Sequence, residues 1–239
     1  MEKYKDTIKR IKPIAEQFVK NNEIEFPIKN SLTLLSNMGY YIIKSPASQN
    51  LSGFYMKKDV YPFIFVNSNH SLGRQNFSLW HEVYHHYMNH HNGISDFNSQ
   101  SLEEREAEIF AGFILLPDIE IIKWSNSYDI RNPKVIAEMS VYYQMSFNAV
   151  VIRIMQLGEI DYVTFRGLKE LSTVEKQQKL QNIYKEVELP ITILEPTYDI
   201  QISKNIMEVL QNNYENKLTL ASKINEIIHK IEVLNNDKY

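Results

Sequence analysis

The sequence predicts an α+β fold that is mostly helical, with a small three-stranded, mainly antiparallel sheet and a helical C-terminal region. Only seven glycines occur in 239 residues, which favours helices over a turn-rich β architecture. Hydrophobic residues recur at helical spacing in several stretches, whereas three short β-rich runs lie together between residues 40 and 66. With 44% hydrophobic and 23% charged residues, the composition is that of an ordinary globular protein.

The elements follow in a definite order along the chain. Two amphipathic helices are expected first, and the three β-rich runs come next, separated by turn formers. An apolar, histidine-rich helix and a second apolar helix that ends before Pro117 complete the first half. These elements are expected at residues 4–20, 27–37, 40–43, 53–56, 61–66, 77–88 and 101–116. Further helices are expected at 118–125, 133–144, 146–157, 172–186, 203–213 and 217–234, with a short β-like piece at 162–165.

The composition also excludes some classes of function. A net charge of -3 argues against a strongly nucleic-acid-binding surface. The chain has no cysteine, so any metal must be held by histidines and carboxylates. The first residues lack the apolar core of a signal peptide, and no stretch is apolar enough to span a membrane, so we expect a cytoplasmic protein. We expect one domain over residues 1–166, with a trailing helical element from about 126, and a helical C-terminal region of unknown role over 167–239.

The most informative motif is the run from His81 to His85, HEVYH. On a helix, residues four apart share a face, so both imidazoles point the same way. Glu82 lies about 100° around the helix from His81, where it can reach a metal-bound water without ligating the metal. Two histidine ligands and a neighbouring general base are the core of a hydrolytic zinc site, which makes Glu82 the candidate catalytic residue.

A catalytic zinc site needs a third protein ligand, and the next helix offers one. Glu104 and Glu108 are four residues apart and share a face of the apolar helix at 101–116. We expect that face to be buried, where a carboxylate requires a partner such as a metal. The sequence therefore predicts Glu104 as the third ligand, and Glu108 as the acceptor of a hydrogen bond from a ligand imidazole.

Several alternatives stay open for the third ligand. Glu104 also fits a capping box with Ser101, and Glu103 or Glu106 would replace it if the helix phase differs. His91 stands ten residues after His81, but on a continuous helix it would lie about 15 Å further along and off the ligand face. The other histidines of this helix, among them His86 and His90, are expected on a solvated face.

Two sequence stretches together resemble the ImmA/IrrE family of metallopeptidases. They are RQNFSLWHEVYH at residues 74–85 and EREAEIFAGFILLP at 104–117, and a weaker likeness extends over about 25–160. The resemblance implies a zincin-like metallopeptidase core within residues 1–166 and one bound Zn²⁺, with Mn²⁺ as an alternative ion. It also implies a zinc-dependent endopeptidase of the anti-repressor type, which cleaves a helix-turn-helix transcriptional repressor and so derepresses mobile-element or stress genes.

This chain departs from the family pattern at three positions. Trp80 stands where a small residue is usual, Tyr84 where glycine is usual, and Glu108 where asparagine or aspartate is usual. None of these substitutions removes a ligand or the base, but Tyr84 would crowd the turn that carries the ligands.

A second interpretation is a non-catalytic regulatory module that keeps the fold as a scaffold for a protein or DNA partner. Residues 133–157 are spaced like a helix-turn-helix pair, yet they offer only Lys134 and Arg153, with Arg131 just before them. Because that set is small for phosphate contacts, helical packing is favoured over direct nucleic-acid binding. The apolar stripe of the last helices would suit core packing, substrate binding or a homodimer.

Overall fold

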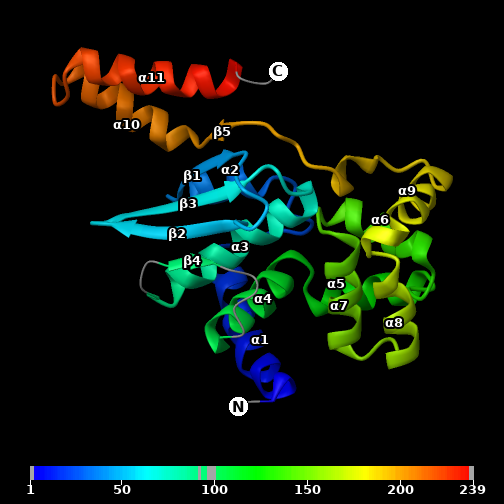
Figure 1. Cartoon of the computed structure of the whole chain (residues 1–239). Helices are drawn as coiled ribbons and strands as arrows, with labels where there is room; N and C mark the ends of the chain where they lie inside the picture. The colour runs from blue at the N-terminus through cyan, green and yellow to red at the C-terminus, as the bar shows by residue number, and fades with distance from the viewer. Residues whose placement is uncertain (1–2, 91–92, 96–100, 237–239) are drawn as a thin grey trace.

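The computed structural model describes residues 3–90, 93–95 and 101–236, and it has the α+β architecture that the sequence predicts (Figure 1). The helices of the first half are α1 (Tyr4–Asn21), α2 (Ser31–Asn37), α3 (Leu72–Tyr87), α4 (Leu102–Leu115) and α5 (Asp118–Ser127). Those of the second half are α6 (Pro133–Tyr142), α7 (Phe147–Leu157), α8 (Tyr162–Glu170), α9 (Gln177–Glu186), α10 (Lys204–Glu215) and α11 (Ala221–Asn236).

The sheet of the described residues has five strands in the order β4-β2-β3-β1-β5, two more than the sequence predicts. Strand β1 runs parallel to β3, and the other three pairings are antiparallel, so the sheet is mainly antiparallel as expected. The extra strands form its two edges, and at three and two residues they are too short to show an alternating pattern. The strands are β1 (Tyr41–Ser45), β2 (Gly53–Lys58), β3 (Tyr61–Asn67), β4 (Gly93–Ser95) and β5 (Gln201–Ile202).

Side-chain caps account for two of the differences between the structure and the sequence prediction. The second helix begins at Ser31 rather than 27, because the Asn30 side chain accepts the hydrogen bond of the Thr33 amide. The β-like piece expected at 162–165 is wrong: Asp161 caps the Thr164 amide, and the stretch opens helix α8. A single N-terminal cap thus outweighs a short run of residues that favour strands.

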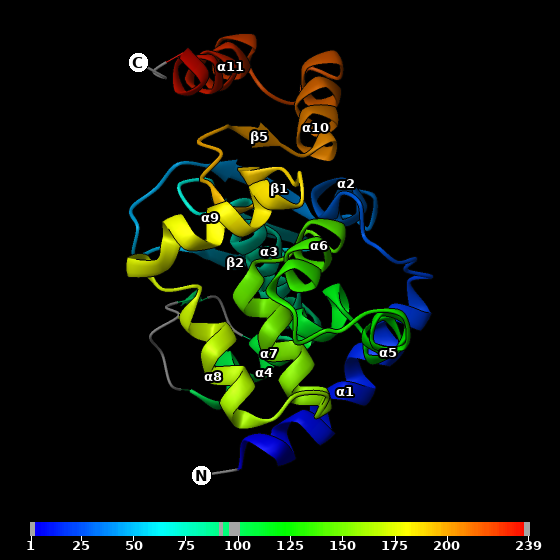
Figure 2. The ribbon, with the colours of Figure 1, turned by 90° about the vertical axis from the view of Figure 1, so that its right-hand side faces the viewer.

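Two buried helices lie beneath the sheet and form the centre of the molecule. Helix α3 packs against β2 and β3 with one side and against α4 with the other, and α1 covers the far side of α4 (Figure 1). Helices α5 to α9 form a second group beside α4, joined to it through α7 (Figures 1 and 2). The HEVYH motif is therefore inside the core, and α4 is the neighbour best placed to add a ligand.

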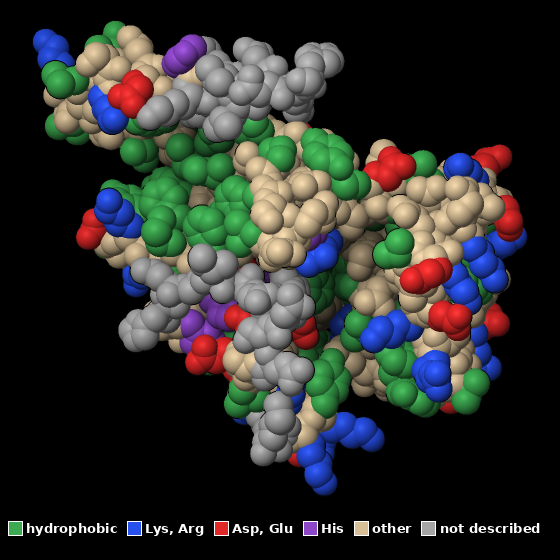
Figure 3. All heavy atoms as spheres, viewed as in Figure 1, with side chains coloured by type: hydrophobic (Ala, Val, Ile, Leu, Met, Phe, Trp, Pro, Cys, Tyr) green, Lys and Arg blue, Asp and Glu red, His purple; other side chains and the backbone are tan. Residues whose placement is uncertain are grey.

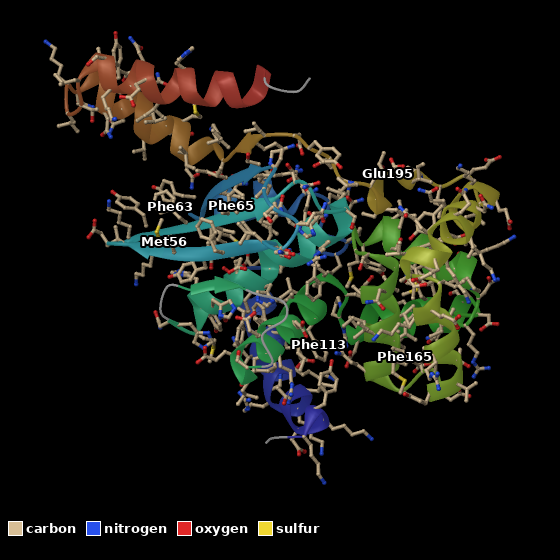
Figure 4. The ribbon with its side chains drawn as sticks, in the orientation of Figure 1. Met56, Phe63, Phe65, Phe113, Phe165 and Glu195 are labelled. Atoms are coloured by element: carbon tan, nitrogen blue, oxygen red, sulfur yellow. The ribbon has the colours of Figure 1, made fainter. Side chains whose placement is uncertain are left out.

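The opposite face of the sheet is apolar and lies towards the α10–α11 hairpin. Met56, Phe63 and Phe65 project from β2 and β3 on that side (Figure 4), and Phe65 stacks on Phe54 with ring centroids 5.2 Å apart. Helix α10 contacts β1 and α2 at one edge. Among the described residues, no helix combines the length and apolarity that crossing a bilayer requires.

The C-terminal region is joined to the sheet through a connector, residues 195–203. The amide of Leu72 bonds the carbonyl of Glu195, which Figure 4 labels beside the start of α3, and Gln75 of α3 bonds the Thr197 hydroxyl. At the far end, the Ser203 hydroxyl accepts the amide of Ile42 at 2.8 Å. The division of domains near residue 166 stays a prediction, but part of the later region is hydrogen-bonded directly to the first.

A buried arginine fixes α7 to the end of α4. Arg153 is 1% exposed, donates to the Leu116 carbonyl at 3.0 Å and to Asp118 at 2.6 Å, and its guanidinium lies 3.8 Å from the centre of the Phe113 ring. Gly112 makes room for it, because a Cβ there would stand 2.8 Å from the Arg153 side chain. Arg153 is thus committed to packing and is not on a phosphate-binding surface.

Replacing Asp118 should destabilise the fold in a pH-dependent way. Burial alone would raise the pKa of Asp118, but its bonds to Lys12 and Arg153 outweigh burial and lower it. The carboxylate therefore stabilises the fold above the ordinary aspartate pKa, and this stabilisation is lost as the pH falls through the lower, folded-state value. We expect Asp118→Asn to cost on the order of 3 kcal/mol in urea unfolding at pH 7, and less at pH 3, which lies below the ordinary aspartate pKa.

The exposed residue Asp59 supplies the matched control for this measurement. Asp59→Asn should leave the free energy of unfolding within about 0.5 kcal/mol of the original at both pH values. A loss in Asp118→Asn that is the same at pH 3 as at pH 7 would contradict the ion-pair explanation.

Candidate metal centre

Helix α3 places His81 and His85 on one face, inside the protein. His81 is fully buried and His85 is 8% exposed, because the helix is packed between the sheet and α4. Their Nε2 atoms are 3.2 Å apart. The two imidazoles of the motif are therefore held side by side, as the helical spacing predicts.

Helix α4 brings a carboxylate to the same point. One Glu104 oxygen lies 3.0 Å from His81 Nε2 and the other lies 3.5 Å from His85 Nε2. Ligand atoms from His81, His85 and Glu104 all lie within 4.8 Å of one another, the arrangement that a metal ion requires. Figure 3 shows purple histidine and red acidic side chains together below the green side chains of the sheet.

The distances from His81 Nε2 suit a tetrahedral ion of the size of zinc. Ligand atoms about 2.0 Å from a tetrahedral centre lie about 3.3 Å from one another. His81 Nε2 lies 3.0 Å from one Glu104 oxygen and 3.2 Å from His85 Nε2, both close to that value. The residues therefore fit the metal, and three protein ligands would leave a fourth position for water or substrate.

The protonation of the two histidines reflects the same geometry. Burial lowers the pKa of His81, but its hydrogen bond to Glu104 and the surrounding carboxylates raise it overall. Burial, together with the charge of His81, lowers the pKa of His85 to about 4. The hydrogen bond between His81 and Glu104 thus favours a proton at the point where a cation would replace it.

The choice among the candidate third ligands follows from the phase of α4. The Ser101 hydroxyl caps the amide of Glu104, and the Glu104 carboxylate turns to the histidines. Glu103 is exposed, and Glu106 instead accepts a hydrogen bond from Tyr84 and pairs with Arg10. The remaining alternative, His91, lies outside the described residues.

The two bulky departures from the family pattern pack in the core, and the Tyr84 ring meets the His85 ring edge-on with centroids 6.1 Å apart. Trp80 is fully buried, and its indole donates to the Ser31 hydroxyl at 3.0 Å. Tyr84 is also fully buried, and its hydroxyl donates to Glu106 at 2.6 Å. Both rings therefore fill the core, and Tyr84 fixes α3 against the helix that carries Glu104.

His90 joins the site, although the sequence analysis places it on a solvated face. Helix α3 ends at Tyr87, and Asn89 takes a left-handed φ of 54°, which turns the chain back. The His90 Nδ1 atom then lies 2.9 Å from Nδ1 of His85, on the side opposite the shared ligand point. His86 is half-buried, and its Nδ1 lies 2.8 Å from the Tyr55 hydroxyl. In the sequence, the sign that the chain turns back before His90 is Asn89, because asparagine adopts a left-handed backbone conformation more readily than most residues.

Glu82 is fully buried beside the ligands and is directed at strand β2. Its carboxylate is close to Gly53, where a Cβ would stand 3.4 Å from Glu82 Oε1 and 2.8 Å from the Phe65 carbonyl. A side chain at Gly53 would therefore press on the carboxylate. The charge of Glu82 acts on His81, as expected for a base beside a metal ligand.

Glu108 occupies a more open position than the sequence predicts. It lies one turn after Glu104 but is exposed, because this face of α4 opens into a cavity instead of the core. Its charge acts on His81 and contributes to the raised pKa of that imidazole. The hydrogen bond that Glu108 would accept from a ligand imidazole stays a prediction.

Residues 36–155, which contain all the candidate ligands, match the profile of the Peptidase M78 family, described as the IrrE N-terminal-like domain. The chain belongs to this family. The resemblance drawn from the two motifs is thereby confirmed, and a peptidase that uses a metal agrees with the cluster of His81, His85 and Glu104. No curated protein matches the sequence of this M78 peptidase.

Removing Glu104 should abolish tight zinc binding. We expect Glu104→Ala to weaken the zinc affinity, measured by isothermal titration calorimetry, by more than about a hundredfold, because only two ligands remain. Glu103→Ala is the matched control, since Glu103 is the adjacent exposed carboxylate. Equal affinity in both variants would rule out Glu104 as the third ligand.

The contact between His90 and His85 predicts that the loss of His90 lowers the zinc affinity less than the loss of Glu104 does. When His85 offers Nε2 to a metal, its Nδ1 carries the proton and donates it to His90. His90→Ala should therefore lower the zinc affinity by about tenfold to a hundredfold. The exposed residue His229 serves as control, and His229→Ala should bind zinc as the original protein does. Unchanged affinity in His90→Ala would contradict the supporting role.

Proposed function

We propose that this M78 peptidase is a zinc-dependent endopeptidase that cleaves a helix-turn-helix transcriptional repressor and so derepresses mobile-element or stress genes. The observation that carries the catalytic part is the convergence of His81, His85 and Glu104 beside the buried carboxylate of Glu82. The substrate class rests on the family resemblance, since the repressor would be recognised by surfaces beyond these four side chains.

The protein side chains divide the work of the reaction. Zinc, when bound, supplies the Lewis acidity that polarises the scissile carbonyl and makes water nucleophilic near neutral pH. His81, His85 and Glu104 hold the ion, and Tyr84 and His90 keep helix α4 and the His85 ring in register with it. Glu82 takes the proton of the attacking water and passes it to the leaving amine, so one group acts first as base and then as acid.

The environment of Glu82 suits this proton transfer. The side chain is excluded from bulk water, and the close packing at Gly53 fixes its position. Because its surroundings hold this carboxylate in place, the carboxylate needs little rearrangement when the transition state forms.

Glu82→Gln separates binding of the metal from catalysis. We expect this variant to bind zinc with unchanged affinity, because Glu82 is no ligand, and to cleave about a hundredfold to ten-thousandfold more slowly. Fragment formation from a repressor encoded beside this gene, followed by mass spectrometry with and without a chelator, measures the rate. Glu103→Gln should cleave normally.

Two results would overturn parts of the proposal. Full proteolysis by Glu82→Gln would exclude the assigned role of Glu82. If the repressor binds tightly but stays intact with zinc present, the protein is a regulatory binding module that retains the peptidase fold.

A further inference from the structure

The sheet carries apolar side chains on both of its faces. Along β1, β2 and β3 the side chains that face α3 are mostly buried, and the side chains between them point to the opposite side. Those apolar side chains form what we call the outer face: Tyr41, Ile43, Phe54, Met56, Tyr61, Phe63 and Phe65. An antiparallel sheet that meets water on one side normally alternates with polar residues there. The pattern therefore indicates a face that another surface covers.

The outer face is one continuous patch. Tyr41 packs against Tyr61 and Phe63, with ring centroids 5.3 and 5.2 Å apart. Phe54 stacks on Phe65 at 5.2 Å. Three side chains of the patch are 39–44% exposed, namely Ile43, Met56 and Tyr61. Figure 3 shows green side chains of the sheet facing the viewer below the hairpin, and Figure 4 labels Met56, Phe63 and Phe65 in the same orientation.

The α10–α11 hairpin is anchored at the edge of its own sheet. Ile202 of β5 pairs with Ile43 of β1, and the Asn205 side chain donates to the Tyr40 carbonyl at 2.8 Å. These contacts fix the beginning of α10 at the β5 edge, and Figures 1 and 2 show the hairpin beyond that edge. Within the part of the chain that the structure describes, the outer face is therefore left open beside an apolar pair of helices.

The hairpin presents an apolar surface of its own, which we call the hairpin stripe. Met207, Leu210 and Tyr214 are spaced three and four residues apart and so share a face of α10. Met207 is 43% exposed and Tyr214 is 55% exposed. Leu218 and Leu220, in the connection to α11, are 69% and 77% exposed. The hairpin thus exposes large apolar side chains along one helix and at its tip.

The two surfaces together are large enough for a stable interface. At about 200 Å² for a large side chain, the outer face and the hairpin stripe each expose on the order of 500 Å² of apolar surface. The largest apolar patch on a typical monomer covers about 300–600 Å² in total. A stable protein–protein interface buries about 800 Å² on each partner, which the two surfaces jointly supply.

The chemistry of the two surfaces favours a second copy of this chain as the occupant. A pair of apolar helices on an apolar sheet face is a common layer arrangement in proteins, but the anchor at β5 holds each hairpin beyond its own sheet. A two-fold axis would bring each hairpin to the sheet of the other copy and cover both surfaces at once. Association through the sheet edges is disfavoured, because β4 and β5 are only three and two residues long.

We propose that two copies of this M78 peptidase form a two-fold dimer, in which the hairpin of each copy packs on the outer face of the other copy's sheet. The candidate ligands lie on the opposite side of the sheet, on α3 and α4, so the dimer requires neither zinc nor substrate. The inference goes beyond the endopeptidase function and is independent of it.

Analytical ultracentrifugation of the full-length protein tests the dimer. We expect a dissociation constant on the order of 1 μM or below, the range of interfaces of this size. Met56→Glu on the outer face and Met207→Glu on the hairpin stripe should each weaken the dimer by at least about a hundredfold, because every dimer would bury two unpaired charges. Val163→Glu is the matched control, since Val163 is 80% exposed on α8, and it should stay dimeric.

Folding of the variants is checked separately from association. Met56 and Met207 are 40% and 43% exposed within one chain, so the far-UV circular dichroism spectrum and the zinc affinity of both glutamate variants should match those of the original protein.

Cross-linking tests which surfaces meet, because the chain has no cysteine of its own. Met56→Cys protein is mixed with Met207→Cys protein and treated with a short bis-maleimide, and the products are analysed by mass spectrometry. We expect a cross-link between positions 56 and 207, which in this mixture must join two chains. Met56→Cys mixed with Val163→Cys should give no such product.

Three results would overturn the inference. One is a protein that stays monomeric at about 100 μM, far above the expected dissociation constant. Another is a dimer that both glutamate variants leave unchanged, since the copies then pair through other surfaces. The third is a cross-link that joins position 56 only to position 56, which would mean that the two sheets face each other. Each of these results leaves the endopeptidase proposal standing if the repressor is cleaved.

Discussion

The packing of α3 against α4 is the constraint on which the candidate site depends. Three ligand atoms from two helices meet only if each helix has the correct rotation and axial position relative to the other. The hydrogen bond from Tyr84 to Glu106 sets that register within the core, and Arg10 of α1 holds Glu106 from its other side. At the far end of α4, Arg153 fixes the helix to α7. The candidate metal centre is therefore positioned by polar contacts inside an otherwise apolar interface.

Much of this arrangement can be predicted from the sequence, because it depends on local periodicity. The spacing of His81 and His85 determines their common face, and the phase of the following helix determines that Glu104 faces them. The main strands and most helix boundaries also follow from local patterns and punctuation by proline or asparagine. These features can be predicted without knowing which elements pack against one another.

The features that were missed depend on tertiary contacts. His90 reaches His85 only because the chain reverses after Tyr87, and an expected continuous helix sends it elsewhere. The direction of Tyr84 depends on a partner 22 residues away, so the sequence suggested a crowded ligand turn where the structure has a filled core. Strand β5 is a two-residue segment that pairs with β1 after more than 150 intervening residues. A pattern within a few neighbouring residues cannot predict a pairing over such a distance.

The connector at residues 195–203 has a consequence for the order in which the protein is assembled. It bonds the start of α3 through Gln75 and then completes the edge of the sheet at Ile42, although it follows the histidines and Glu104 by more than 90 residues. A ribosome releases these residues late, long after the histidines and Glu104 have emerged. The edge of the sheet is therefore incomplete on a nascent chain that stops before the connector. Full organisation around the candidate ligands thus waits until the connector has been synthesised.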